Sequence, residues 1–185
     1  MSEVIDFQKE AIGRLRARVA ELDGVNDSLL AITRGHRGAT AMVHRAVLAA
    51  LDADGLDHLV HVVIADWVDM LGLDVIVLAL ESGRQHIRMG TGGVRFLAPQ
   101  DLEALFPHGA TVVHGRSLDL FGEAQPLLQS YVAIRLPAVP PLPTGVLALG
   151  SRAPAAFEVG FETELFDFLG AVVSRSVARW LTATP

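Results

Sequence analysis

Two histidines, His58 and His61, have the spacing that most suggests chemistry, and they lie in a segment that the apolar pattern predicts to be helical. Residues three apart share one face of a helix, as two ligands of one metal ion must. A zinc site needs further ligands, and neither an HExxH motif nor a nearby carboxylate pattern completes one. The flanking leucines and valines favour structural histidines. We therefore predict no metal and no cofactor; the other histidines are scattered, and whether any binds haem or a metal stays open.

The sequence contains no motif that is typical of nucleophilic catalysis. The chain has no cysteine, which excludes disulfides, thiolate metal sites, cysteine nucleophiles and thioether-linked chromophores together. No GxSxG motif is present, and the glycine-rich segment 90–93 lacks the GK[ST] ending of a phosphate-binding loop. A tight hairpin turn accounts for that segment. We therefore expect no catalytic residues and a protein that is not an enzyme.

Charge and hydropathy limit the classes of partner. The 185 residues carry a formal net charge of −6, so no overall basic field attracts nucleic acid. The acidic first residues lack the basic-then-apolar order of a signal peptide. The longest apolar stretch, 131–150, contains Arg135 and four prolines, which a membrane-spanning helix tolerates poorly. We expect a cytoplasmic protein that binds neither nucleic acid nor a membrane.

A heptad repeat runs through the beginning of the chain. Its a positions are Ile5, Ile12, Val19, Asn26 and Thr33, and its d positions are Gln8, Leu15, Leu22 and Leu29. β-Branched residues at a with leucine at d favour a parallel two-stranded coil, and a single Asn at a fixes its register. We predict a dimerisation helix over residues 1–38 and a parallel homodimer through residues 5–33. The alternative is a single amphipathic helix that lies on its own domain.

The remaining residues, 39–185, alternate between helical and strand patterns. Helical spacing is found over 42–51, 56–71, 99–106 and 161–181, and strand-like runs over 75–80, 86–89, 94–97, 111–114, 131–136 and 145–150. Short hairpin connections imply a mainly antiparallel sheet, and helices from both ends of the chain should cover one face. The predicted fold class is an α+β sandwich of the GAF/PAS type, with helices flanking the sheet, preceded by the coiled-coil helix.

Strand alternation predicts which side chains the terminal helices cover. In the strand 131–136, Val132, Ile134 and Leu136 point one way, and Tyr131, Ala133 and Arg135 point the other. The last helix should bury an apolar stripe against the first set. The residues expected in that stripe are Leu165, Phe168, Leu169, Val172 and Trp180.

Several motifs, taken in order, resemble the DUF484 family. They are Leu120-Phe121-Gly122, Leu147-Ala148-Leu149-Gly150-Ser151-Arg152, Thr163-Glu164-Leu165, the segment 44–51 (HRAVLAAL), and Leu15-Arg16-Ala17-Arg18 with Asn26 in the coil. The resemblance extends over nearly the whole chain, from about Val4 to Leu181. It implies a GAF-like domain that follows an N-terminal helix. It implies no chemistry, because that family is uncharacterised.

The sheet face that the terminal helices leave uncovered is the candidate site. A charged residue in the middle of a strand needs solvent, a counter-charge or a ligand, so Arg135 with Tyr131 would suit a small anion or carboxylate. The resemblance implies a ligand site on this same side. The predicted ligand-binding residues are Tyr131, Arg135, Phe121, Gly122, His114 and Ser151. The alternative is an Arg135 that pairs with a nearby carboxylate such as Asp119 or Glu123.

These inferences favour a non-enzymatic, dimeric, GAF-like module with a regulatory or scaffolding role. Its candidate ligand is a small molecule, and its protein partner is not identified by the sequence. Two alternatives belong to other classes. One is an enzyme that acts on a small carboxylate in the same pocket, and the other is a structural dimer that binds a partner and has no ligand.

Overall fold

The structure is a computed structural model that describes residues 18, 38–81, 93–157 and 163–183. Arg18, which is helical and exposed, is the one described residue of the predicted coil. The rest of the heptad segment, 5–33, lies outside the described residues. The parallel dimer and the domain boundary at residue 38 therefore stay predictions.

A five-stranded sheet forms the centre of the domain, in the order β2-β1-β5-β4-β3. Its strands are β1 (Val75–Glu81), β2 (Val94–Leu97), β3 (Val112–Gly115), β4 (Ser130–Leu136) and β5 (Gly145–Ser151). Neighbouring strands are antiparallel except β1 and β2, which are parallel. The predicted α+β class with a mainly antiparallel sheet is confirmed. The strand predicted at 86–89 lies outside the described residues.

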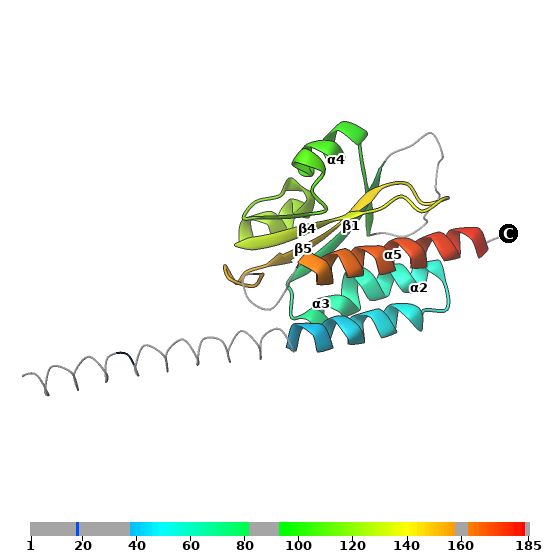
Figure 1. Ribbon diagram of the computed structural model, residues 1–185, viewed down its shortest axis with the longest axis horizontal. Helices are drawn as coiled ribbons and strands as arrows, with labels where there is room; N and C mark the ends of the chain where they lie inside the picture. Colours follow the sequence, from blue (N-terminus) through cyan, green and yellow to red (C-terminus); the bar gives the residue numbers. More distant parts are fainter. Residues whose placement is uncertain (1–17, 19–37, 82–92, 158–162, 184–185) are drawn as a thin grey trace, which may run out of the picture.

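Helices from both ends of the described chain cover one face of this sheet (Figure 1). They are the helix at 38–51, α2 (Leu56–His61), the π-helical turn η1 (Val62–Asp66), α3 (Trp67–Leu71) and α5 (Thr163–Ala183). The buried indole of Trp67 ties two of them together, because its Nε1 donates a hydrogen bond of 2.8 Å to the Ala46 carbonyl. Within the described residues, no helix is long and apolar enough to cross a membrane.

The covered face, which we call the helix face, carries the side chains that strand alternation predicts. Val132, Ile134 and Leu136 are completely buried there, in one cluster with residues of α5. The helix packs close to β4, since a Cβ added at Gly170 would lie 2.9 Å from Ile134 Cγ2.

The apolar stripe predicted for the last helix is wrong in one respect. Phe166 is completely buried, whereas Phe168 has 45% of its surface exposed. Two residues along a helix are separated by about 200° of rotation, so the two rings face opposite sides. Phe166 instead makes edge contacts with Phe157 and His114.

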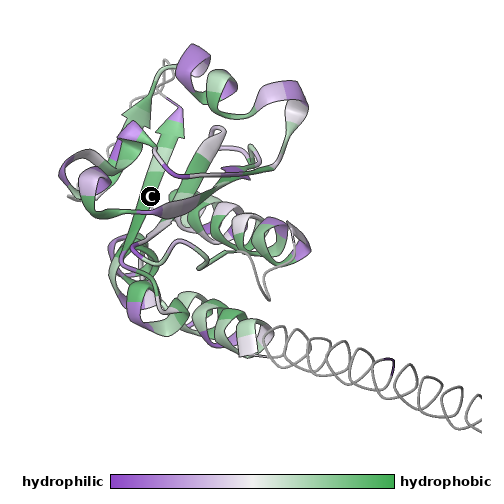
Figure 2. Cartoon of the chain, turned by 90° about the vertical axis from the view of Figure 1, so that its left-hand side faces the viewer, coloured by the Kyte–Doolittle hydropathy of each residue, from purple (hydrophilic) through white to green (hydrophobic). Residues whose placement is uncertain are grey.

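The opposite face, which we call the cavity face, has small residues at its centre. Ala133 lies opposite Ala148 in the register of β4 and β5, and Gly150 lies opposite Tyr131. Short elements cover this face, namely α4 (Pro99–Leu105), η2 (Pro107–Gly109) and η3 (Asp119–Leu127). Their apolar residues fill the space that the alanines leave, and these are mainly Leu102, Phe106, Leu120 and Phe121. Figure 2 shows hydrophobic residues along the strands and more hydrophilic residues on the outer elements.

Candidate functional site

Tyr131 is a polar residue of the cavity face near the beginning of β4, opposite Gly115 of the edge strand β3. Its ring lies across the neighbouring strand β3, because a Cβ added at Gly115 would lie only 2.5 Å from Tyr131 Cε1 and 2.7 Å from its hydroxyl oxygen. Phe121 packs edge-on against the ring, with the two centroids 6.1 Å apart. The glycine at 115 is therefore what allows the tyrosine to lie flat over the sheet.

The Tyr131 side chain is mostly buried, and its hydroxyl has no hydrogen-bond partner among the described residues. The residue is 8% exposed, and no described residue makes a hydrogen bond with this hydroxyl. Burial raises the pKa of Tyr131 above its usual value of 10.0, so the group is a neutral donor at neutral pH. The hydroxyl oxygen itself keeps contact with solvent, so it can be reached from the surface. The hydroxyl is therefore a candidate contact for a ligand.

A cavity of about 760 Å³ lies between α4 and η3 and has Tyr131 in its wall. We call it the α4–η3 cavity. Its polar lining residues are Arg95, Asp101, Ser117, Asp119 and Tyr131, and its apolar ones are Phe96, Leu97, Ala104, Leu105, Leu118 and Leu120. A mostly apolar concavity with a few polar groups is the usual form of a small-molecule site, of roughly 300–1,000 Å³.

Side-chain hydrogen bonds hold one wall of this cavity in place. Gln125 Oε1 accepts a hydrogen bond of 2.8 Å from the Leu118 backbone N–H, and Gln125 Nε2 donates one of 3.1 Å to Ser117 Oγ. These bonds fix the segment between β3 and η3 against η3 itself. Bonds within the protein itself thus hold this wall in place.

Arg95 is a functional candidate that the sequence analysis missed. It lies on β2 beside Ala79 of β1, which places its side chain on the cavity face. Its guanidinium lies against Gly122, where an added Cβ would be 3.1 Å from Nη2. Gly122 has a φ of 58° and a ψ of −124°, a conformation that favours glycine. Among the described residues, no carboxylate pairs with Arg95. The alternation of side chains along residues 94–97 is the sequence feature that could have placed Arg95 on the cavity face.

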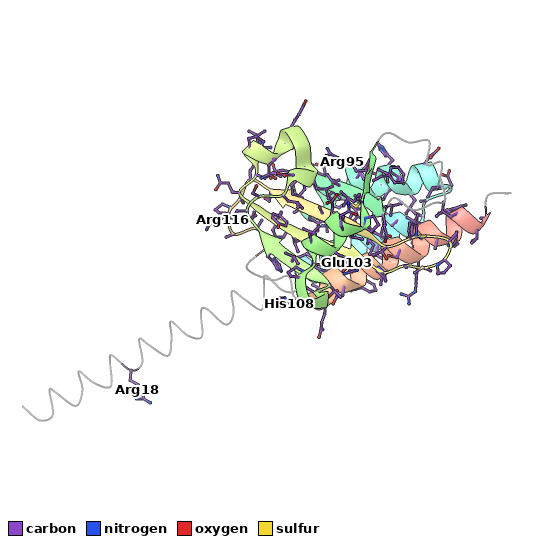
Figure 3. All side chains as sticks on the ribbon, turned by 90° about the horizontal axis from the view of Figure 1, so that it is seen from above. Arg18, Arg95, Glu103, His108 and Arg116 are labelled. Atoms are coloured by element: carbon purple, nitrogen blue, oxygen red, sulfur yellow. The ribbon has the colours of Figure 1, made fainter. Side chains whose placement is uncertain are left out.

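Arg135, predicted as a ligand group, is already paired. Its Nη2 donates to Glu103 Oε1 of α4, and its guanidinium lies 5.6 Å from the centre of the Phe106 ring. The predicted alternative of a paired arginine is therefore the one observed, although the partner is Glu103 and not Asp119 or Glu123. Arg135 is four residues from Tyr131 along β4, a separation of roughly 13 Å, so the two do not converge. Figure 3 shows Glu103 and Arg95 apart on this side of the molecule.

Two other predicted site residues, His114 and Ser151, belong to the helix face. His114 lies opposite Val132 in the register of β3 and β4, and its ring is 5.9 Å from that of Phe166. Partial burial there lowers the pKa of His114 below its usual 6.5. Of the six predicted residues, Tyr131 lines the α4–η3 cavity, while Phe121 packs against the Tyr131 ring and Gly122 lies against Arg95.

Ser151 takes part in a structural contact at the end of the sheet. Its Oγ donates a hydrogen bond of 3.2 Å to Asp74 Oδ2, which also accepts one of 2.8 Å from the Arg152 N–H. Arg152 Nε donates to Asp74 Oδ1 at 2.7 Å. The hydrogen bonds from the backbone and side chain of Arg152 lower the pKa of Asp74 below its usual 3.8. These contacts join the beginning of β1 to the end of β5.

A second, smaller hollow of about 420 Å³ lies at the end of β3 and β4 and shares Tyr131 with the first. We call it the edge cavity. It is lined by His114, Gly115, Arg116, Gln129, Ser130, Tyr131, Pro154 and Phe157. The Ser130 Oγ donates to the Ala153 carbonyl at 2.6 Å, so this hydroxyl could only accept a hydrogen bond there.

The two histidines of the HxxH pattern have separate partners. His58 Nδ1 lies 2.8 Å from Asp54 Oδ1, and His61 Nε2 lies 3.7 Å from Asp66 Oδ1. In the part of the chain that the structure describes, no three His, Asp or Glu side chains are grouped as metal ligands.

Comparison with known families identifies the family of this chain. The family described as "Protein of unknown function, DUF484" matches residues 1–182. The chain belongs to the DUF484 family. A comparison of this DUF484 chain with curated proteins finds no match. Among solved structures it is similar to the GAF domain of the Acinetobacter phosphoenolpyruvate-protein phosphotransferase, at 13% identity and a TM-score of 0.49, over 79% of this chain and 95% of that one.

Proposed function

We propose that this DUF484 chain is a regulatory or scaffolding module that binds a small molecule in the α4–η3 cavity and does not convert it. The observation that carries the proposal is Tyr131, a mostly buried residue in the wall of the cavity whose hydroxyl lacks a partner among the described residues. A ligand in the cavity can accept a hydrogen bond from this hydroxyl in place of water. The fixed cavity wall at Gln125 also supports a preformed site.

The proposal includes a dimer through residues 5–33. Its support is the heptad with Asn26 in the sequence, together with an exposed apolar side in the next helix, where Leu48 is 60% and Leu51 50% exposed. A coil that joins two domains can report a ligand only if the ligand binds two states of the dimer with different affinity. Light scattering of the full chain beside Leu22→Arg tests the dimer, because a charge at a d position should give monomers. A wild-type chain that is monomeric would contradict it.

A thermal-shift screen of metabolites on the full chain tests the ligand site. Wild type is compared with Tyr131→Phe, which removes only the hydroxyl, and with Arg175→Gln, an exposed α5 residue on the other side of the sheet. At least one compound should stabilise wild type and Arg175→Gln, and stabilise Tyr131→Phe less. Hits that shift all three proteins equally would place the ligand elsewhere. The absence of any hit would favour the purely structural dimer, and consumption of a hit by the protein would favour the enzyme.

A further inference from the structure

The charges around the α4–η3 cavity have both signs and are not paired with one another. Arg95 contributes a guanidinium, and Asp101 and Asp119 contribute carboxylates. None of the three makes an ion pair or a side-chain hydrogen bond with a described residue. All three residues are exposed, so their charged groups are solvated and accessible to a ligand that enters the cavity. The cavity therefore offers a free cation and two free anions.

The space between these charges is apolar. Leu97, Leu105, Leu118 and Leu120 line the same cavity, and Leu120 is 8% exposed. A ligand without an apolar part would leave this surface in contact with water. A ligand without charges would displace water from the charged groups that it covers and offer them no new partner.

We propose that the cavity takes a zwitterion with an apolar body, which is the chemistry of an apolar amino acid or of a short apolar peptide. The inference rests on the proposed ligand site and adds the class of ligand. Arg95 contacts the carboxylate, since a guanidinium forms a two-pronged contact with that group. Asp101 and Asp119 contact the ammonium, and the leucines contact the apolar body. Two carboxylates against one guanidinium disfavour a dianion.

Four probes separate the parts of this recognition: phenylalanine, leucyl-phenylalanine, 2-phenylethylamine and 3-phenylpropionate. The amine lacks the carboxylate and the acid lacks the ammonium, while both keep the ring. Calorimetry on the full wild-type chain compares the amine and the acid with whichever of phenylalanine and leucyl-phenylalanine binds more tightly. Both the amine and the acid should bind at least about tenfold more weakly, as the loss of a charged hydrogen bond predicts. The comparison of phenylalanine with the dipeptide distinguishes a free amino acid from a peptide as the source.

Variants that remove one charge test which residue recognises which charged group of the ligand. Arg95→Gln should lose the preference for the zwitterion over the amine, and Asp119→Asn or Asp101→Asn should lose part of the preference over the acid. Arg175→Gln should keep both preferences. Binding of 3-phenylpropionate as tight as that of the zwitterions, or no binding of either zwitterion at millimolar concentration, would overturn the inference. A screened compound of other chemistry whose stabilisation depends on Tyr131 would leave the ligand site in place while this class of ligand fails.

Discussion

The two faces of the sheet are built from the same five strands but are packed in opposite ways. The helix face carries large side chains such as Leu78, Ile134 and Leu147, which are completely buried under long helices. The cavity face carries Ala79, Ala133 and Ala148 at its centre, and short elements cover it. Apolar residues of the covering elements fill the space above these alanines, and the α4–η3 cavity opens beside them, next to β2 and Tyr131. The helix face is therefore closely packed, whereas the cavity face keeps a hollow at its side.

The largest expected effect is on the helix face. Phe166→Ala should lower the free energy of unfolding by about 3–5 kcal/mol, because it removes a completely buried ring. Phe168→Ala is the matched control and should cost less than about 1 kcal/mol, because that ring is half exposed. Chemical denaturation of both variants measures the difference. Equal losses would mean that the two rings are buried alike and that α5 is rotated from its described position.

A smaller loss is expected where the cavity face is tight. Gly115→Ala should cost about 1–3 kcal/mol, since its Cβ would lie 2.5 Å from the Tyr131 ring. The cost should nearly disappear when Tyr131→Ala is already present, and a double-mutant cycle measures this coupling. Gly38→Ala, where an added Cβ meets nothing within 4 Å, should cost no stability, since alanine also favours the helix at that position. A full cost of Gly115→Ala without the tyrosine ring would refute the contact.

The contacts of Asp74 should make part of the stability depend on acidic pH. The folded-state pKa of Asp74 is lowered, so its contribution is fully present above about pH 4 and is lost as the pH falls through the folded pKa. Wild type should therefore be more stable than Asp74→Asn at neutral pH, and the difference should shrink in acid. Denaturation at several pH values measures it, with Asp69→Asn, an exposed α3 residue, as control. A difference that is constant with pH would speak against a lowered pKa.

The smallest effect is the titration of Tyr131, which is the single tyrosine of the chain. Burial raises its pKa above 10.0, so the absorbance of tyrosinate should appear at higher pH in the folded protein than in denaturant. Because the unfolded chain loses this proton first, stability should fall as the pH rises above about 10. An identical titration in the folded and denatured states would show that the hydroxyl is fully solvated.

Within β4, the sequence correctly predicts which side chains lie on which face, because successive side chains of a strand point to opposite faces. It could not assign His114 or Ser151, since their faces depend on how separate strands align. The pairing of Arg135 with Glu103 joins residues 32 positions apart in the sequence, and only the placement of α4 over the sheet brings them together. The sequence predicts Phe168 and not Phe166 as the buried ring, because an apolar pattern fixes the rotation of a helix only coarsely.

The single tyrosine also provides the most direct test of the ligand site. The full chain is labelled with 3-fluorotyrosine, so that the fluorine NMR spectrum contains one resonance, that of residue 131. Titration with a compound that stabilises wild type should move this resonance saturably, with the same dissociation constant that calorimetry gives, and Arg175→Gln should leave the response unchanged. A resonance that stays in place while the compound binds would contradict a ligand site in the α4–η3 cavity.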